Sequence, residues 1–259
     1  MAPLPANAFS DPTLEAADRA MEAAARKETP RDYLGFSAIG HPCSRKLWYD
    51  LHLDGSAKPH SASTLKMFAD GHASEAIQAR RFRMVDGVTL WIVDPDTGRQ
   101  FGFSDLDGRF KGHMDGAIYG LLQAPKAWHV WEHKCANEKK QAKLLSFKSS
   151  LGEKAALQAW DPVYYAQAVL YMHYSGMDRH YLTCASPGTR HTISVRTNAD
   201  TAFALVLRDK AERILNARAP LAKLSNDPAW WQCRWCEHHA RCHGVASEAA
   251  TSEAQDEAP

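Results

Sequence analysis

The sequence lacks the features of a membrane, secreted or repeat protein. It contains no run of about 18 apolar residues, the length that a membrane-spanning helix requires. Its first 30 residues do not combine a basic start with an apolar stretch, so no secretory signal is expected. It shows no internal repeat and no GxxxxGK phosphate-binding loop, which argues against a repeat array and a nucleotide-driven motor. We therefore expect an intracellular, cytoplasmic protein without membrane contact.

Net charge is also small. The whole chain carries +1, which by itself favours no class of partner. The charge is uneven, because residues 245–259 contain four acidic residues and no lysine or arginine. Without those four negative charges the rest of the chain carries about +5, a mild basic bias that suits a local groove for phosphates. We expect the acidic tail itself to be disordered.

Hydrophobic residues make up 45% of the 259-residue chain, which is enough for one buried core. The predicted helices cover residues 13–27, 44–53, 63–85, 137–147, 162–174 and 202–217, and the predicted strands cover 88–93, 100–103, 113–119, 127–135, 181–185 and 192–195. This order predicts an α/β fold with a mixed central sheet flanked by helices. We expect a flexible segment over 1–35, one domain over 36–244 and the disordered tail over 245–259.

An acid and a lysine stand two residues apart inside an apolar strand pattern. Glu132 and Lys134 leave the same face of that strand, where burying them is costly unless they pair or serve chemistry. Asp115 precedes them in a glycine-flanked stretch of another predicted strand. Two carboxylates from neighbouring strands can hold Mg²⁺ or Mn²⁺, and a lysine beside them can position water. The alternatives are an ordinary salt pair of Glu132 with Lys134, and a turn role for Asp115 with Asp105 or Asp107 as the ligand.

Two predicted helices carry further candidates. The helix over 63–85 places His72 and Glu75 on one side, because they are three residues apart. The helix over 162–174 carries polar and aromatic residues on one face, and the basic helix before it carries lysines that can contact phosphates. These residues are Tyr164, Gln167 and Tyr171 on the former and Lys139, Lys140, Lys143 and Lys148 on the latter. The alternatives are a solvated helix acid, core-edge residues and a solvated lysine face.

Asp115 and the Glu132-x-Lys134 motif together resemble the signature of the PD-(D/E)xK nuclease superfamily, with Met114 in the proline position. The resemblance implies a restriction-endonuclease-like core that cleaves DNA with Mg²⁺ or Mn²⁺. It also implies that Asp115 and Glu132 ligate the metal and that the backbone carbonyl of His133 is a further ligand. Lys134 would then position the attacking water.

The flanking helices add to this resemblance. Glu75 ends a G-x-x-x-E pattern, which supplies an extra metal-facing acid in the superfamily. His72 is a lesser candidate, because RecB-type members place their His–Glu pair at a different spacing. Gln167 and Tyr171 resemble the helical residues with which RecB-type nucleases contact DNA, and Tyr164 lies on the same helix face.

The sequence has six cysteines, and an intracellular protein uses clustered cysteines for metal rather than for disulfides. Cys233, Cys236 and Cys242 form a C-x2-C-x5-C pattern, which needs a fourth ligand. A zinc site completed by a neighbouring histidine is one possibility, and Cys43 as the fourth ligand is another. The histidines concerned are His238, His239 and His243, and the cysteines left over as expected strand core residues are Cys135 and Cys184.

The placing of the cysteines, one before the predicted core and three after it, is similar to that in CRISPR-associated exonucleases and AddB-type helicase-nucleases. That resemblance implies a 4Fe–4S cluster that closes the domain, with zinc as the alternative. It further implies an exonuclease that processes DNA ends for recombination or repair. Phages encode such enzymes beside a single-strand annealing protein, and a phage protein would work in the host cytoplasm. The competing predictions are a structure-specific endonuclease and a nucleic-acid-binding module without catalysis.

Overall fold

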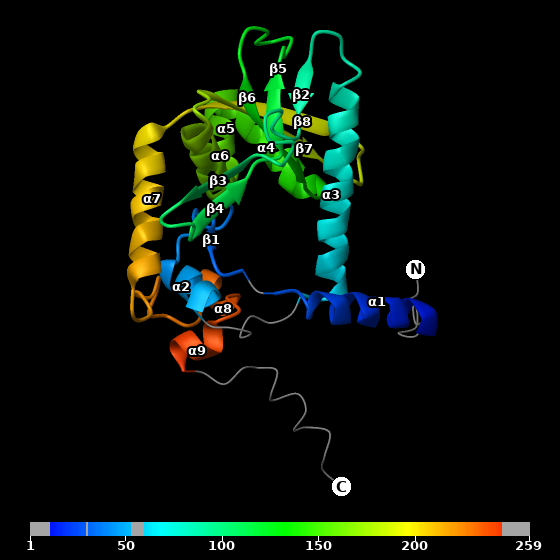
Figure 1. The fold of residues 1–259 in the computed structure, drawn as a ribbon. Coiled ribbons are helices and arrows are strands. Elements are labelled where there is room, and N and C mark those ends of the chain that lie inside the picture. The colour runs from blue at the N-terminus through cyan, green and yellow to red at the C-terminus, as the bar shows by residue number, and fades with distance from the viewer. Residues whose placement is uncertain (1–10, 30, 53–59, 245–259) are drawn as a thin grey trace.

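The computed structural model describes residues 11–29, 31–52 and 60–244, and the predicted acidic tail lies outside them (Figure 1). The helices are α1 (Pro12–Ala25), α2 (Ser44–His52), α3 (Ala62–Phe82), α4 (Glu138–Leu151), α5 (Glu153–Trp160), α6 (Pro162–Ser175), α7 (Thr201–Asn216), α8 (Trp231–Arg234) and α9 (His239–His243). The strands are β1 (Leu34–Gly35), β2 (Thr89–Trp91), β3 (Gly102–Asp105), β4 (Phe110–His113), β5 (Gly116–Tyr119), β6 (His129–Cys135), β7 (Arg179–Ala185) and β8 (Thr192–Asn198). Each predicted helix has an observed counterpart.

The strands form two sheets. The larger sheet has the order β2-β5-β6-β7-β8, with β6 parallel to β7 and the other neighbours antiparallel. The smaller sheet has the order β1-β4-β3, with β1 parallel to β4. The parallel pair β6–β7 requires a crossover connection, and α4, α5 and α6 supply it. The predicted class, α/β with a mixed central sheet flanked by helices, is confirmed.

Side-chain alternation along β6 separates the two faces of the larger sheet. Val130 belongs to the main core with residues of α4, α5 and α6, while Trp131 packs with Phe82 of α3 on the opposite face. Figure 1 shows α3 on one side of the sheet and α5 and α6 on the other. Glu132 and Lys134 are in step with Val130, so both side chains leave the α6 face of the sheet.

The strand predicted over 113–119 is wrong as a single element, because the chain passes there from one sheet to the other. β4 belongs to the smaller sheet and β5 to the larger one, and Asp115 lies in the short link between them. Glycine is required on both sides of the link. A Cβ on Gly112 would lie 2.5 Å from the Phe36 ring, and one on Gly116 would lie 2.5 Å from the Trp91 carbonyl oxygen.

Besides the short helices α8 and α9 of the cysteine segment, two elements have no counterpart in the sequence prediction. Helix α5 follows Gly152, whose φ of 79° ends α4 and lets the chain change direction within one residue. It buries Leu157 and Trp160 beneath the larger sheet. The basic helix predicted over 137–147 is therefore followed by a separate, partly buried helix. Strand β1 is only two residues long, too short for an alternation pattern, and it is defined by the pairing of Leu34 with Phe110.

Segments from the two ends of the described chain meet where α2 lies against α7. Trp48 Nε1 donates to the Ala217 carbonyl at 2.8 Å, and Arg45 Nη1 donates to the Leu221 carbonyl at 2.8 Å. Lys210 of α7 donates to two backbone carbonyls in the turn before α2. These bonds bring the start of α2 next to the chain that follows α7.

Helix α1 lies outside the core. None of its described residues is buried, and it contacts α3 through the ion pair of Asp18 with Lys66 and a hydrogen bond from the Ala62 N–H to Glu22. The domain boundary expected at residue 36 stays a prediction. No helix in the described part of the chain combines the length and the apolar character needed to cross a membrane.

Buried histidine makes the fold sensitive to acid. His180 on β7 is 1% exposed, and neither of its ring nitrogens has a hydrogen-bond partner among the described residues. Burial lowers the pKa of His180 to about 3, whereas a histidine in an unfolded chain titrates near 6.5. Below pH 6.5 the unfolded state therefore takes up a proton that the folded state excludes, and stability falls as the pH falls toward 3.

We predict that His180→Leu removes this part of the acid sensitivity. The free energy of unfolding, measured by urea denaturation, should fall less between pH 7 and pH 5 in the variant than in the wild type, by up to about 2 kcal/mol. His191→Gln changes a histidine at an exposed loop position and should leave the pH dependence as it is. An equal fall in His180→Leu and the wild type would contradict the assignment.

Candidate active site

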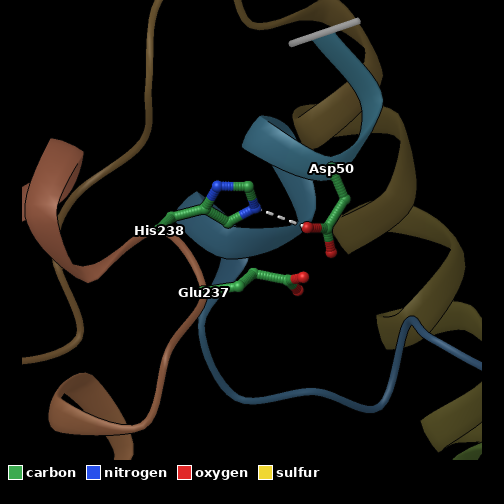
Figure 2. A group of neighbouring side chains, drawn as sticks. All are labelled: Asp50, Glu237 and His238. Carbon is green, nitrogen blue, oxygen red and sulfur yellow. Dashed lines mark hydrogen bonds and ion pairs between the residues drawn. The ribbon is translucent and has the colours of Figure 1, made fainter. Parts of the chain in front are cut away.

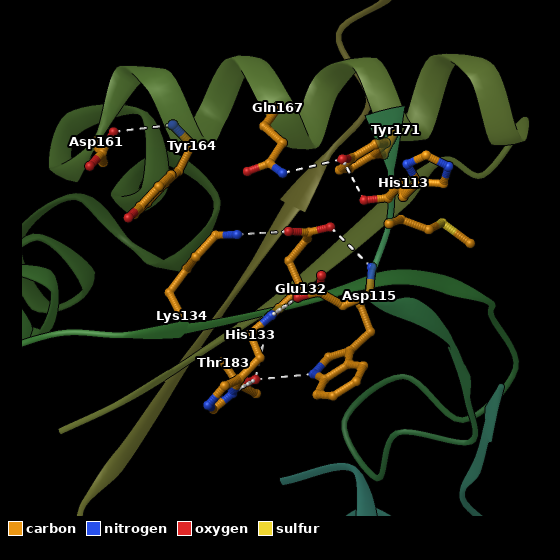
Figure 3. Close-up of polar contacts among 12 residues, drawn as sticks. His113, Asp115, Glu132, His133, Lys134, Asp161, Tyr164, Gln167, Tyr171 and Thr183 are labelled. Carbon is orange, nitrogen blue, oxygen red and sulfur yellow. Dashed lines mark hydrogen bonds and ion pairs between the residues drawn. The ribbon is translucent and has the colours of Figure 1, made fainter. Parts of the chain in front are cut away.

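The acid and the lysine of β6 meet Asp115 at the point where the chain changes sheets (Figure 3). Glu132 is 1% exposed, and both of its carboxylate oxygens accept hydrogen bonds. Oε1 accepts from the backbone N–H of Asp115 at 3.3 Å, and Oε2 accepts from Lys134 Nζ at 2.9 Å. In turn, Asp115 Oδ2 accepts from the backbone N–H of His133 at 2.8 Å. The structure thus places the three predicted residues side by side.

Burial and mutual repulsion raise the pKa values of the two acids. Burial raises the pKa of Glu132, and the negative charge of Asp115 raises it further. Burial also raises the pKa of Asp115, although Lys134 and the N–H of His133 lower it. Burial opposes the charge on Lys134, but Glu132 and Asp115 outweigh it and hold the pKa of the ammonium group above its usual range. The cluster contains more acid than Lys134 neutralises, so it favours a further cation.

Helix α3 brings a third acid to this cluster. Burial raises the pKa of Glu75 to about 7, and the charge of Asp115 contributes in the same direction while Lys134 opposes it. His72, about one turn earlier on α3, is exposed, and its charge lowers the pKa of Asp115. Both predicted residues of α3 therefore lie within electrostatic reach of Asp115.

A chain of hydrogen bonds holds α3 against the larger sheet. His133 Nε2 lies 2.9 Å from Ser74 Oγ of α3, and His133 Nδ1 lies 2.9 Å from Thr183 Oγ1 of β7. Trp131 Nε1 donates to the same Thr183 oxygen at 3.0 Å. Burial lowers the pKa of His133 to about 4, so at neutral pH the ring donates through one nitrogen and accepts through the other. Because Ser74 adjoins Glu75, this chain of bonds also positions the third acid.

Helix α6 covers the carboxylates on the face of the sheet opposite to α3 (Figure 3). Tyr171 OH donates to the His113 carbonyl at 2.6 Å, and Gln167 Nε2 donates to Tyr171 OH at 3.3 Å. Both side chains are buried. They hold α6 to the end of β4, immediately before the link that contains Asp115. Contact of DNA with Gln167 and Tyr171 stays a prediction.

The ring of Tyr164 lies close to two ammonium groups. Lys134 Nζ is 5.2 Å and Lys140 Nζ is 4.7 Å from the ring centroid. Lys140 also pairs at 2.8 Å with Asp161, whose side chain caps the start of α6. Lys140 is thereby tied to α6, whereas Lys139 is exposed on α4. The phosphate contacts expected of these lysines remain predictions.

The two alternatives to Asp115 lie in the hairpin between β3 and β4. Asp105 accepts hydrogen bonds from Tyr174 OH at 2.7 Å and from Arg208 Nε at 3.1 Å, which join the hairpin to α6 and α7. Asp107 lies in the turn itself, with a φ of 57°. The geometry therefore favours Asp115 over either alternative as the partner of Glu132.

The four cysteines expected to bind metal line one pocket. Cys43 lies just before α2, and Cys233, Cys236 and Cys242 lie in the C-terminal segment. All are free thiols, and burial raises the pKa of Cys233 and of Cys236, with the charge of Cys43 adding to both shifts. A tetrahedral zinc with bonds of about 2.3 Å would space its sulfurs by roughly 3.8 Å. Among the described residues, no three of these sulfurs lie within 4.8 Å of one another.

The histidines near the cysteines and the two remaining cysteines agree in part with their predicted places. The same pocket is also lined by His41, His238, His239 and His243. Cys184 is fully buried on β7 as expected, while Cys135 at the end of β6 is only half-buried.

Figure 2 shows a polar group of Asp50, Glu237 and His238, of which His238 also lines the cysteine pocket. His238 Nε2 lies 2.7 Å from Asp50 Oδ1, and Lys46 Nζ lies 2.7 Å from Asp50 Oδ2 and 2.6 Å from Glu237 Oε1. Within the described ranges, Asp50, Glu237 and His238 form the group of possible metal ligands whose ligand atoms lie within 4.8 Å. Lys46 already provides the cation between the two acids. We interpret the group as an ion-pair network that ties α2 to the C-terminal segment.

No family model and no curated protein matches the sequence. Among solved structures, the chain is similar to SSO0001, with a TM-score of 0.51 and 12% identity, over 92% of this chain and 100% of that one. It is also similar to the alkaline exonuclease LHK-Exo of Laribacter hongkongensis, with a TM-score of 0.49 and 14% identity, over 76% of this chain and 90% of that one. The complex of LHK-Exo with dAMP gives a TM-score of 0.48 and 14% identity, over 75% and 89% of the two chains. The similarity to SSO0001 shows a shared fold.

Sequence reasoning missed the residues that fix α3 in place. Ser74 and Thr183 bond to His133 across separations of 59 and 50 residues, and a serine in a helix or a threonine in a strand does not stand out by type. A signal for His133 was available. It alternates with Glu132 and Lys134, so its side chain must leave the opposite face of β6, toward α3.

We predict that Glu75→Gln stabilises the metal-free protein at pH 8. Glu75 has a folded-state pKa of about 7, above that of an unfolded glutamate, so the stability it contributes is lost as the pH rises through about 7. Because Glu75 is only half-buried, we expect a gain in unfolding free energy on the order of 1 kcal/mol at pH 8 and a smaller one at pH 5.

Urea denaturation in the presence of a chelator measures this difference. Glu28→Gln, which neutralises an exposed carboxyl after α1, serves as the matched control and should show no gain at pH 8. A Glu75→Gln protein that is less stable than the wild type at pH 8 would show that Glu75 is not repelled by the cluster.

Proposed function

We propose that the protein is a metal-dependent DNA nuclease and, more narrowly, an exonuclease that processes DNA ends. The observation that carries this proposal is the buried cluster of Glu132, Lys134 and Asp115. An ordinary salt pair lies at the surface, whereas Glu132 is 1% exposed and faces a second acid across the strand break. An excess of buried acid costs stability, and it is characteristic of sites whose charges are used in chemistry.

The donor atoms suit a hard divalent ion. Glu75, Asp115 and Glu132 offer carboxylate oxygens, which Mg²⁺ and Mn²⁺ prefer, and the backbone carbonyl of His133 is a further candidate ligand. Such an ion would polarise the phosphodiester and offset charge on the leaving oxygen. The Lys134 ammonium already occupies Glu132 Oε2, so the lysine would have to share or leave that oxygen.

We assign to Lys134 the role of positioning the attacking water. Its charge is maintained by Glu132 and Asp115, and the ring of Tyr164 lies against its ammonium group. A fixed positive donor at this place can hold a water molecule and stabilise negative charge that develops on the phosphate. The residues that we expect to contact the DNA strand are Tyr164, Gln167, Tyr171, Lys139 and Lys140. His72 has a secondary role near Asp115.

We predict that Lys134→Ala lowers DNA cleavage by about 100-fold or more, because an active-site donor of this kind is lost. DNA binding, measured by fluorescence anisotropy, should change only slightly. Lys27→Ala removes an exposed lysine near the end of α1 and should cut as the wild type does. Full cleavage by Lys134→Ala would contradict the assignment of the site.

The same assay separates the kinds of nuclease. End-labelled linear DNA and closed circular DNA are digested in parallel with Mg²⁺. Loss of the linear DNA alone supports an exonuclease, and cutting of both supports a structure-specific endonuclease. Binding without any cutting would favour a nucleic-acid-binding module and would make Glu132 and Lys134 a structural salt pair.

We further propose that the cysteine pocket holds a 4Fe–4S cluster. Four thiolates suit an iron–sulfur cluster, and the four cysteines line one pocket although they come from both ends of the described chain. Cys43 and Cys233 are 190 residues apart in the chain, so a bound cluster would close a very long loop and stabilise the fold. Zinc held by the three C-terminal cysteines and a histidine is the alternative.

We predict that Cys236→Ser damages folding more than chemistry. Iron and acid-labile sulfide should fall in the anaerobically purified variant, and its thermal unfolding temperature should fall with them. Cys135→Ser removes a half-buried cysteine outside the pocket and should keep the wild-type iron content. A Cys236→Ser protein with unchanged metal content and stability would exclude the cluster.

A further inference from the structure

Three aromatic side chains gather near the start of β6. The ring centroids of Trp91 on β2 and Trp128 just before β6 are 4.6 Å apart, and that of Tyr119 on β5 is 5.3 Å from Trp128. Trp91 is 41% exposed, and the other two rings are half-buried. We refer to Trp91, Tyr119 and Trp128 as the aromatic platform.

Strand register places the aromatic platform on the same face of the sheet as the acid cluster. Trp91 pairs with Ala117, and Ala117 pairs with Val130, so these three side chains leave one face. Tyr119 is two residues from Ala117 and shares that face. Glu132 is two residues from Val130 and shares it as well.

The platform is also near the acid cluster along the strands. Trp91 is one strand across from Asp115 and two residues along, since it pairs with Ala117. Strand geometry then gives about 8 Å between the Cα atoms of Trp91 and Asp115. A stacked nucleic-acid strand advances by roughly 3.4 Å per nucleotide along its axis, so Trp91, the platform residue nearest the acids, lies about two nucleotides from them.

The strand ends around the platform are basic. His129 follows Trp128, and its side chain leaves the opposite face of β6; besides burial, three positive charges at this end of the sheet lower the pKa of His129. These charges belong to Lys154, Arg179 and Arg196. Glu153 pairs with Arg196 and offsets it in part, while the exposed Lys126 adds a further positive charge in the loop between β5 and β6. The end of the sheet that carries the platform is therefore positively charged, which favours phosphate groups there.

We propose that the aromatic platform is a base-stacking subsite for unpaired nucleotides of the DNA strand that is cut at the acid cluster. This inference rests on the nuclease function proposed above. Indole and phenol rings stack on nucleobases with little sequence preference, and nearby cations hold the phosphates between them. Unpaired ends suit the platform better than duplex does, because the base faces inside a duplex are already covered by their neighbours.

A thermodynamic cycle between protein and DNA tests the subsite. All proteins in the cycle carry Lys134→Ala, so that the DNA is not cut. Two dye-labelled probes are compared: an oligothymidylate, and the same oligonucleotide without bases on the three terminal nucleotides at each end. Trp91→Leu should weaken binding of the intact oligonucleotide by roughly five- to 150-fold, the range of base–aromatic stacking. Removing the bases should weaken binding to the Lys134→Ala protein similarly but have little further effect on Trp91→Leu.

Two further variants make the result specific. Trp91→Phe keeps an aromatic ring and should recover most of the binding and of the coupling to the bases. Trp235→Leu removes a tryptophan that is 81% exposed just after α8, far from β2 in Figure 1, and should leave both unchanged. If Trp91→Leu is unstable, Trp91→Thr, which also removes the ring and suits a half-exposed strand position, takes its place in the cycle.

The outcomes separate the subsite from the nuclease function. Cutting of DNA by the wild type, together with equal binding of both oligonucleotides by the Lys134→Ala protein, would overturn the subsite and leave the nuclease. A wild type that neither binds nor cuts DNA would overturn both proposals. Loss of self-association in Trp91→Leu, measured by sedimentation with DNA binding unchanged, would overturn the subsite and make the platform a contact between protein molecules.

Discussion

A carboxylate that is almost completely buried has to receive hydrogen bonds from fixed donors, and around Glu132 this requirement shapes the middle of the molecule. One donor is the backbone N–H of Asp115, which can reach Glu132 only because the chain leaves the smaller sheet just before it and enters the larger sheet just after it. The other donor is Lys134, on the same strand and the same face. The strand break and the strand alternation are therefore two parts of one arrangement.

The residue between the acid and the lysine joins this arrangement to the rest of the fold. The backbone N–H of His133 holds Asp115, and its ring holds Ser74 of α3 and Thr183 of β7. Strand alternation thus sends one set of side chains to the acid cluster and the other to the helix that carries Glu75. A shift of one residue in the register of β6 would exchange the two sets and leave the acid and lysine facing α3.

Sequence periodicity was sufficient for those features that depend on neighbouring residues. It predicted that Glu132 and Lys134 share a face, and it predicted the helices on either side of the sheet. It could not predict the break at Asp115, because that break depends on the close approach of Phe36 and Trp91 to two glycines. The contacts of Ser74 and Thr183, the short strand β1 and the aromatic platform were out of reach for the same reason, since each depends on pairing between distant segments.

The contacts between α2 and the last part of the described chain have a consequence for how the protein is made. Trp48 and Ala217 are 169 residues apart, Arg45 and Leu221 are 176 apart, and Asp50 and His238 are 188 apart. Contacts of such high order have the largest loop-closure entropy and form late. During synthesis, α2 leaves the ribosome long before α7 and the C-terminal segment are made, so Trp48 stays unburied until then. Until the two ends join, the exposed apolar surface of α2 makes a newly made chain prone to aggregation and proteolysis.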